Sequence, residues 1–403
     1  GAIFELRSRG NASSRDVWVY NGNKERLLDN VKRHIDFYEE EKIRLQGALK
    51  RLSTRREQDQ YVTHHIMNDP TRGKWEREIN KNLARDYSEP FDEERLVKAI
   101  YRPFYKTWFY NSKLLNNTRY QIPSIFPTPA HENLVIQVIG TGESTPFSCL
   151  MSNVIPDLHV LSGGQCHPLY YYEKVEENSQ NELLGATNDE NIQDGYVRRE
   201  AITDDALRDF QGHYQDHNIT KEDIFYYVYG VLHSKEYRKK YAADLKKESA
   251  RIPFAPDFWA FSKAGRKLGE LHVNYEQVEP YPLEEHSTEL LFETRDYYRV
   301  EKMRFGGAAR NPDRSVIQVN DHFRLEGIPE QAYEYVVNGK PALEWLIDRY
   351  QYTQDRETGI INDPNEWSDD PRYIVDLIKR VVTVSVETVK IVDGLPSLKA
   401  EEG

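Results

Sequence analysis

The chain has 403 residues and a formal net charge of −12, with 38% hydrophobic and 30% charged residues. This length predicts two or three domains, and no apolar run approaches the roughly 18 residues that a membrane span needs. The acidic total argues against a protein that coats nucleic acid without regard to sequence, whereas specific binding needs only a local basic face.

The first residues, Gly1–Glu5, lack the basic and apolar regions of a secretory signal and are typical of the interior of a strand. We therefore expect a fragment that begins inside a domain. The chain has two cysteines, Cys149 and Cys166, which are too few for a disulfide framework or a four-cysteine zinc site. We expect both thiols to be reduced and buried.

The N-terminal ninety residues predict short strands followed by helices. Strands are expected over residues 3–7 and 16–20. Apolar residues at spacings of three and four predict a helix from Lys24 to about Leu52. Further helices are expected over 74–87 and 92–100.

The middle of the chain is expected to be rich in β-structure from residue 107 to about 172. Its clearest strand is the β-branched run Leu134–Ile139, which two glycines follow. The acidic, Asn-rich stretch 174–195 predicts a surface loop, and helices are then expected over 202–215 and 221–247.

The remaining sequence predicts mixed structure. The pattern favours a helix at 257–271, strands at 297–304 and 315–325, and helices near 341–351 and 372–381. The whole chain is therefore expected to be α+β, with a helical connector and helical C-terminal parts around a β-rich segment.

Six groups of residues, in chain order, resemble the C-terminal part of type ISP restriction–modification enzymes, which carry all their activities on one polypeptide. They are Arg15–Asn21 with Asp36–Tyr38, Tyr101–Phe104 with Trp108–Tyr110, Gly164–Tyr170, Ile224–Ser234 with Tyr237, Arg238 and Ala250–Phe254, Gly265 with Leu271–Glu276, and Tyr335–Gly339 with Arg349, Tyr350 and Gly359–Asn365. Together they extend over nearly the whole chain.

The resemblance implies a target-recognition domain for double-stranded DNA. In that family one chain carries a nuclease, a helicase-like ATPase, a coupler, an adenine methyltransferase and a target-recognition domain. Residues 1–90 would hold the last methyltransferase elements and a helical connector, and residues 91–403 the recognition domain. Within it we expect a β-rich part (105–200) that carries the recognition loops, a helical part (201–280) and a mixed part (281–403).

The same resemblance implies covalently linked catalytic domains and a cytoplasmic, prokaryotic protein without membrane contact. The parent enzyme would use S-adenosylmethionine, ATP and Mg²⁺, and we expect no cofactor in this chain. The resemblance leaves open whether this chain is an enzyme by itself. Our prediction is that the chain alone has no enzymatic activity.

The catalytic motifs of such enzymes are missing from this sequence. It has no G-x-x-x-x-G-K-[ST] phosphate loop and no Asn/Asp-Pro-Pro-Tyr/Phe motif, which holds a flipped adenine in amino-methyltransferases. The nearest match, Asp370–Tyr373, is explained by a proline in the first turn of a helix. His213 and His217 have the spacing of a metal pair but lack a third ligand, so no metal site is expected.

The best candidates for phosphate contact lie in the basic stretch after residue 234. Arg238, Lys239 and Lys246 are expected to contact phosphates, and Lys263 and Arg266 to extend that surface. The alternative is a solvated helix face with Tyr237, Tyr241 and Leu245 turned inward.

Residues elsewhere are weaker candidates. Arg102 and Arg119 flank aromatic residues, and Ser14 and Arg15 lie in the loop that, by the resemblance, faces the flipped adenine; a salt bridge between Arg15 and Asp16 explains that pair equally well. The polar turns of the β-rich part supply Ser144, Thr145 and Gln165, which are residue types that read base edges.

Two other functions compete with DNA recognition. One is a coupler or scaffold domain of the same enzyme without DNA contact, which the acidic total favours; the other is a stand-alone methyltransferase. Loss of DNA binding on addition of salt distinguishes a DNA-recognition domain from the coupler domain. A cofactor-binding test reveals a stand-alone methyltransferase.

Overall fold

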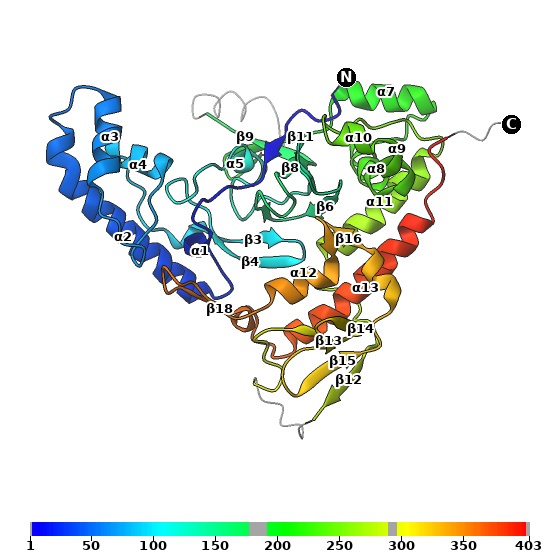
Figure 1. Ribbon diagram of the computed structural model, residues 1–403. Coiled ribbons are helices and arrows are strands. Elements are labelled where there is room, and N and C mark those ends of the chain that lie inside the picture. Colours follow the sequence, from blue (N-terminus) through cyan, green and yellow to red (C-terminus); the bar gives the residue numbers. More distant parts are fainter. Residues whose placement is uncertain (1, 177–191, 289–295, 400–403) are drawn as a thin grey trace.

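The computed structural model describes residues 2–176, 192–288 and 296–399, and it confirms a mixed α+β chain. In Figure 1 a helical arm lies on the left, small sheets occupy the centre, helices gather at the upper right, and a further sheet lies at the bottom. Within these ranges no helix combines the length and hydropathy that a membrane crossing requires. Most of the predicted loop 174–195 lies outside the described residues.

The arm is built on one long helix that the sequence predicted. The side chain of Asn23 accepts a hydrogen bond from the backbone of Arg26 and so starts this helix. Residues 16–20, predicted as a strand, instead form one helical turn and a short strand, because Trp18 and Val19 pack into the core from the turn. The elements are α1 (Asp16–Val19), β2 (Tyr20–Asn21), α2 (Lys24–Leu49), α3 (Arg55–His65) and α4 (Arg77–Ala84).

The helix predicted over 92–100 is wrong. A short 3-10 turn there leads into a strand that pairs along its length with the next strand, and this ladder outweighs the local helical pattern. The 3-10 turn is η1 (Glu93–Arg95). The sheet has the order β2-β4-β3-β7, and its further strands are β3 (Leu96–Arg102), β4 (Tyr105–Tyr110) and β7 (Ile155–Pro156).

A second central sheet has the order β1-β8-β5-β6, and both its middle strand β5 and its edge strand β6 are buried along their whole lengths. A three-stranded sheet, β10-β11-β9, lies beside it through the short helix α5. The members are β1 (Ser8–Arg9), β5 (Val135–Val138), β6 (Cys149–Ser152), β8 (Gln165–Pro168), β9 (Tyr170–Lys174), β10 (Ile192–Gln193), β11 (Tyr196–Glu200) and α5 (Ile122–Ile125).

The helical group covers β6. Thr220 and Asp223 form the predicted capping box at the start of α8, but the single helix predicted over 221–247 is divided into three. Helices α8 and α11 touch at Gly230 and Gly265, where no side chain separates the backbones. The elements are α7 (Asp204–Tyr214), α8 (Lys221–His233), α9 (Lys235–Lys240), α10 (Ala242–Leu245) and α11 (Phe258–Val273).

The C-terminal part combines a four-stranded sheet with helix α13, which runs back to the helical group. The strand predicted over 297–304 is wrong, since a strand begins only at Arg304. The elements are β12 (Glu284–Ser287), β13 (Arg304–Ala308), β14 (Asn311–Gln318), β15 (Phe323–Glu326), η2 (Glu330–Glu334), β16 (Val336–Val337), β17 (Lys340–Pro341), α12 (Ala342–Arg349), β18 (Thr353–Gln354), β19 (Ile361–Asn362), η3 (Pro364–Glu366) and α13 (Tyr373–Asp393).

The hydrophobic core does not stop at the domain boundary expected at residue 90. Leu27 and Ile79 of the arm belong to the same buried cluster as Phe109 and Val135 of the central sheets. The arm is therefore packed onto the rest of the chain, while the division at 90/91 stays a prediction.

Candidate nucleic-acid interface

Four of the predicted DNA-contacting residues line cavities at the two ends of strand β5. Leu134, just before the strand, lines a cavity that also contains Arg119. Ile139, just after it, lines a smaller cavity with Thr145, Arg238 and Lys246. At about 3.3 Å per residue the two ends are roughly 17 Å apart, so these residues form two separate groups.

The loop that follows β5 is anchored at its base. The backbone N–H of Gly140 donates to the carbonyl of Ser162 at 2.9 Å, and that of Gly142 donates to the carbonyl of Lys246 at 2.8 Å. Gly142 has a φ of +83°, which glycine adopts without strain. The polar tip, with Ser144 exposed, is thus held against α10. We call loop 141–145 together with α9 and α10 the loop–helix face.

The cations of the loop–helix face differ in their solvent exposure. Lys239 and Lys246 are exposed, and neither forms an ion pair with a described residue. Tyr237 and Leu245 are buried beneath them, as expected for a helical surface with one solvated side.

Arg238 is held inside this face. Its Nε donates to the carbonyl of Leu232 at 2.7 Å, and its Nη2 lies 3.6 Å from the sulfur of Cys149. The guanidinium carbon also lies 5.6 Å from the centre of the Phe147 ring. These contacts make Arg238 a support for the loop–helix face, and they explain why it is only partly exposed.

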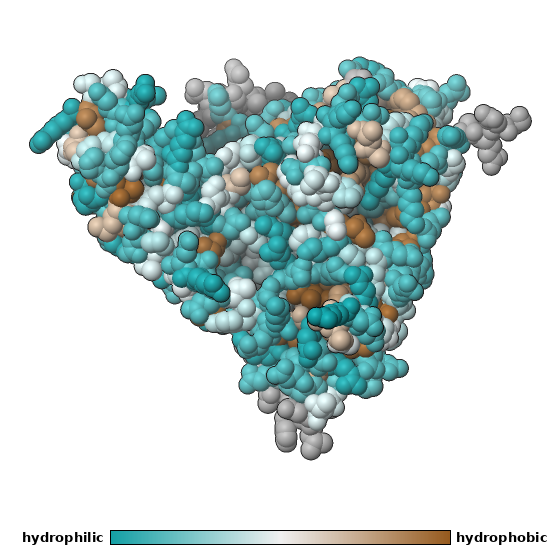
Figure 2. Space-filling view, in the orientation of Figure 1, coloured by the Kyte–Doolittle hydropathy of each residue, from teal (hydrophilic) through white to brown (hydrophobic). Residues whose placement is uncertain are grey.

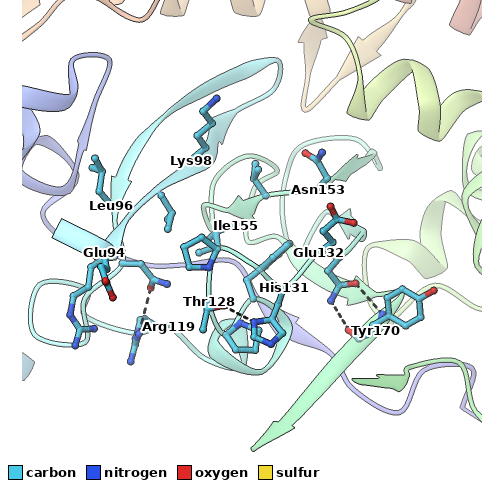
Figure 3. A pocket seen from close by; sticks show the side chains of 18 of the residues that line it. Glu94, Leu96, Lys98, Arg119, Thr128, His131, Glu132, Asn153, Ile155 and Tyr170 are labelled. Carbon is cyan, nitrogen blue, oxygen red and sulfur yellow. Dashed lines mark hydrogen bonds between the residues drawn. The ribbon is translucent and has the colours of Figure 1, made fainter. Parts of the chain in front are cut away.

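The larger cavity, at the other end of β5, measures about 1010 Å³, and Figure 3 shows residues that line it, among them Lys98 of β3, Ile155 of β7 and Tyr170 of β9. Arg119 lines it, and burial, the largest influence, lowers the pKa of that guanidinium. Lys98 and Arg198 line it too, each placed over an aromatic ring: Lys98 Nζ is 5.5 Å from the centre of Trp108, and Arg198 Cζ is 4.3 Å from that of Tyr170. Within the described residues, none of the three cations has a carboxylate partner.

Sequence reasoning missed Lys98 and Arg198. The residues around Lys98 were predicted as a helix, which would have placed this side chain among the neighbouring acids. The alternation of residues in β11, Tyr196–Glu200, signals a strand with Arg198 on its exposed face. Their meeting at one cavity depends on the pairing of β9 with β11 and was not visible in the sequence.

Arg15 is engaged inside the protein. Its side chain is 0% exposed, its Nη2 is 3.1 Å from Glu76, and its Nη1 donates to the carbonyl of Leu115 at 2.7 Å. The salt bridge expected with Asp16 is wrong, because Asp16 instead accepts from the hydroxyls of Ser13 and Tyr101. Arg15 is therefore held inside the protein as a structural residue, and its contact with DNA stays a prediction.

Arg102 is also engaged with a buried partner, and its contact with DNA stays a prediction. Its Nη1 lies 3.0 Å from Asp157, whose other carboxylate oxygen accepts from the Tyr20 hydroxyl at 3.0 Å. Burial, and then the nearby Asp16, raise the pKa of Asp157 to about 7. Arg102 thus stabilises a buried carboxylate rather than facing solvent.

Arg266 is partly exposed and ion-paired, and its contact with DNA stays a prediction. Its guanidinium lies 3.1 Å from Glu222 and 3.5 Å from Asp223, at the start of α8, and 4.2 Å from the centre of the Tyr226 ring. Its neighbour Lys263 on α11 is exposed.

The remaining candidates stand apart from one another. Ser14 is exposed with a φ of +61°, beside the buried Arg15. Gln165 lies on β8, opposite Arg9, and is half-buried. Thr145 Oγ1 lies 3.4 Å from Ser162 Oγ, which ties it to the base of its loop.

The residues that imitate catalytic motifs have structural partners. Arg372, in the Asp370–Tyr373 match, forms ion pairs with Glu285 and Asp376 just before α13. The His213 ring stacks on Phe254. Glu284, His286 and Glu326 converge on the exposed lower sheet, where His286 Nε2 is 3.1 Å from Glu326.

Comparison with known proteins agrees with this geometry. The model of the family described as Type ISP C-terminal specificity domain matches residues 2–377. Three solved structures are similar: a nuclease-deletion mutant of the Type ISP enzyme LlaGI with a DNA substrate mimic (34% identity, TM-score 0.83), the ATP-dependent Type ISP enzyme LlaBIII bound to DNA (30%, 0.83), and a DrdV–DNA complex (32%, 0.78).

These matches cover 100%, 99% and 98% of this chain but 34%, 24% and 36% of the relatives, so the chain spans about a third of their length or less. Among curated protein sequences no match was found. The family model and the relatives, each at least 30% identical, extend over nearly all of the chain. The chain therefore belongs to the Type ISP C-terminal specificity domain family.

Proposed function

We propose that this chain recognises a specific sequence in double-stranded DNA for a single-chain restriction–modification enzyme. Domains linked to it would carry out adenine methylation and ATP-driven translocation and cleavage, with S-adenosylmethionine, ATP and Mg²⁺ bound in those domains. The chain alone would neither methylate nor cleave DNA. It would act in the cytoplasm of a prokaryote, where the free thiols of Cys149 and Cys166 stay reduced.

The observation that carries this proposal is the loop–helix face. An anchored polar loop lies next to two exposed lysines, and this combination supplies both kinds of contact that recognition needs. Lys239 and Lys246 would hold phosphates, while Ser144 and Thr145 would approach base edges. In the same proposal Lys263 extends the phosphate contacts along α11.

The cavity at the other end of β5 would take part as well. This concave surface would attract the negatively charged DNA backbone through three cations, Lys98, Arg119 and Arg198. Ser14 and Gln165 complete the set of proposed contacts.

The test is binding of the full 403-residue chain to a random duplex pool, followed by sequencing of the bound fraction. Enrichment of one asymmetric motif, with affinity that falls steeply between 50 and 200 mM salt, supports the proposal. The Lys239→Gln/Lys246→Gln variant should bind several-fold more weakly, with a slope of log affinity against log salt that is shallower by up to about 2. The matched control, Lys302→Gln/Arg310→Gln, removes two exposed cations from the lower sheet and should bind like the wild type.

The acidic total charge favours one other function, a coupler domain that contacts only protein. The face in Figure 2 is mostly hydrophilic, with apolar residues in small separate groups, so it offers no broad apolar docking surface. Absence of duplex binding at low salt would favour the coupler.

A further inference from the structure

The turn that joins α2 to α3 carries a dense group of exposed cations. Four basic side chains lie within seven residues, and all four are exposed. We call this group the arm tip; it consists of Lys50, Arg51, Arg55 and Arg56.

The two carboxylates nearest in sequence are already engaged. Glu57 belongs to the capping box of α3, where it accepts from the backbone of Thr54 at 3.0 Å. Asp59 accepts two hydrogen bonds from Arg85, at 2.6 and 3.0 Å. Neither carboxylate therefore forms an ion pair with a cation of the arm tip.

Three other cations of the arm are paired with carboxylates. Two basic residues of α2 and one in the segment between α3 and α4 each have a carboxylate within 3.6 Å, whereas the four at the tip have none among the described residues. The paired residues are Lys42, Arg44 and Arg72. The four tip cations thus form a dense group without ion pairs in the described part of the chain.

The arm holds its tip rigidly and at a distance. Helix α2 has 26 residues, which is about 39 Å at 1.5 Å per residue. Its start is tied to the C-terminal part by an ion pair between Arg26 and Glu366 at 3.0 Å, and Leu45, Leu49 and Val62 are buried near its far end. In Figure 1 the arm lies at the left and α9 and α10 at the upper right.

We propose that the arm tip binds the phosphates of duplex DNA that flanks the recognition sequence on one side. This inference rests on the proposed function. A duplex carries one negative charge per about 1.7 Å of axis, so it meets several tip cations at once, and an arm of about 39 Å reaches on the order of one helical turn away. The contact acts only at close range, because charges are screened beyond about 10 Å at 0.1 M salt.

The test compares two variants that each lose one lysine and two arginines. The tip variant is Lys50→Gln/Arg55→Gln/Arg56→Gln, which keeps the Thr54–Glu57 cap. The control variant is Lys302→Gln/Arg304→Gln/Arg310→Gln, which changes exposed residues of the lower sheet. Binding of the full chain is measured on the selected sequence alone and on the same sequence with about 15 base pairs added to either side.

We expect the wild type and the control variant to bind more tightly when one particular flank is present. On that long duplex the tip variant should bind at least about ten-fold more weakly at 50 mM salt, with a salt slope shallower by up to about 2.7. On the short duplex all three proteins should bind alike and select the same sequence.

Equal affinity and salt slope of tip variant and wild type on both long duplexes would overturn the arm-tip proposal and leave DNA recognition intact. Tip-dependent binding of long duplexes without enrichment of any sequence would support the tip contact and overturn sequence recognition. If the wild type binds no duplex at low salt, both proposals are wrong.

Discussion

A methyl group added at the contact between α8 and α11 should destabilise the protein strongly. A Cβ on Gly265 would lie 1.8 Å from the carbonyl oxygen of Tyr226 and 2.8 Å from the backbone nitrogen of Gly230. Both are backbone atoms of a helix, so they cannot rotate away, and the two helices must separate. Separation would loosen the buried cluster that contains Phe261 and Leu268.

The magnitude for Gly265→Ala follows from two opposing contributions. Overpacking a close-packed core costs typically 1–3 kcal/mol, and a clash with backbone at this distance belongs at the upper end. Alanine in place of glycine in a helix returns about 1 kcal/mol. The free energy of unfolding should therefore fall by about 2 kcal/mol or more.

Urea unfolding followed by circular dichroism measures this change, and Gly47→Ala provides the matched control. Gly47 is also inside a helix, but a Cβ there meets no atom within 4 Å. The control should gain about 1 kcal/mol, because only the helix propensity changes. If Gly265→Ala proves as stable as the wild type, the close approach of the two helices is wrong.

Three further outcomes can be measured by the same unfolding assay. Arg15→Met should cost about 3 kcal/mol, since it leaves Glu76 without its cation and removes donors to buried carbonyls; a loss below 1 kcal/mol would contradict a structural role. Thr220→Ala should cost about 1 kcal/mol by removing the cap of α8, and Thr220→Ser should restore most of it. Burial lowers the pKa of His34 and of His272 to about 3. Between pH 6.5 and about 3 the unfolded chain therefore binds protons that the folded chain does not, so stability should fall as the pH is lowered through this window. The fall is up to about 1.4 kcal/mol per pH unit for each histidine, and an unfolding midpoint that is unchanged between pH 7 and 5.5 would contradict it.

Patterns carried by neighbouring residues were enough to predict several elements of this protein. The spacing of apolar residues predicted α2, and the residues Thr220 and Asp223 predicted the start of α8. Motifs in chain order indicated the family, which the family model confirms. These features are readable because their causes lie within a few residues of one another.

The structure corrected predictions that depend on distant partners. Residues 92–100 look helical by themselves, but the strand of Tyr105–Tyr110 lies beside them and forms a ladder. The arginines also have distant partners: Arg15 meets Glu76, which is 61 residues away, and Arg102 meets Asp157, which is 55 residues away. Composition alone could not show which cations are neutralised.

The sequence by itself thus determined the family, the fold class and the most regular helices. Only the tertiary structure decided which charges are free: it buried Arg15, exposed Lys246 and left the arm tip without ion pairs among the described residues. The physical reason is that helix formation depends on residues three or four apart, whereas the partner of a charge is chosen by packing across the whole chain.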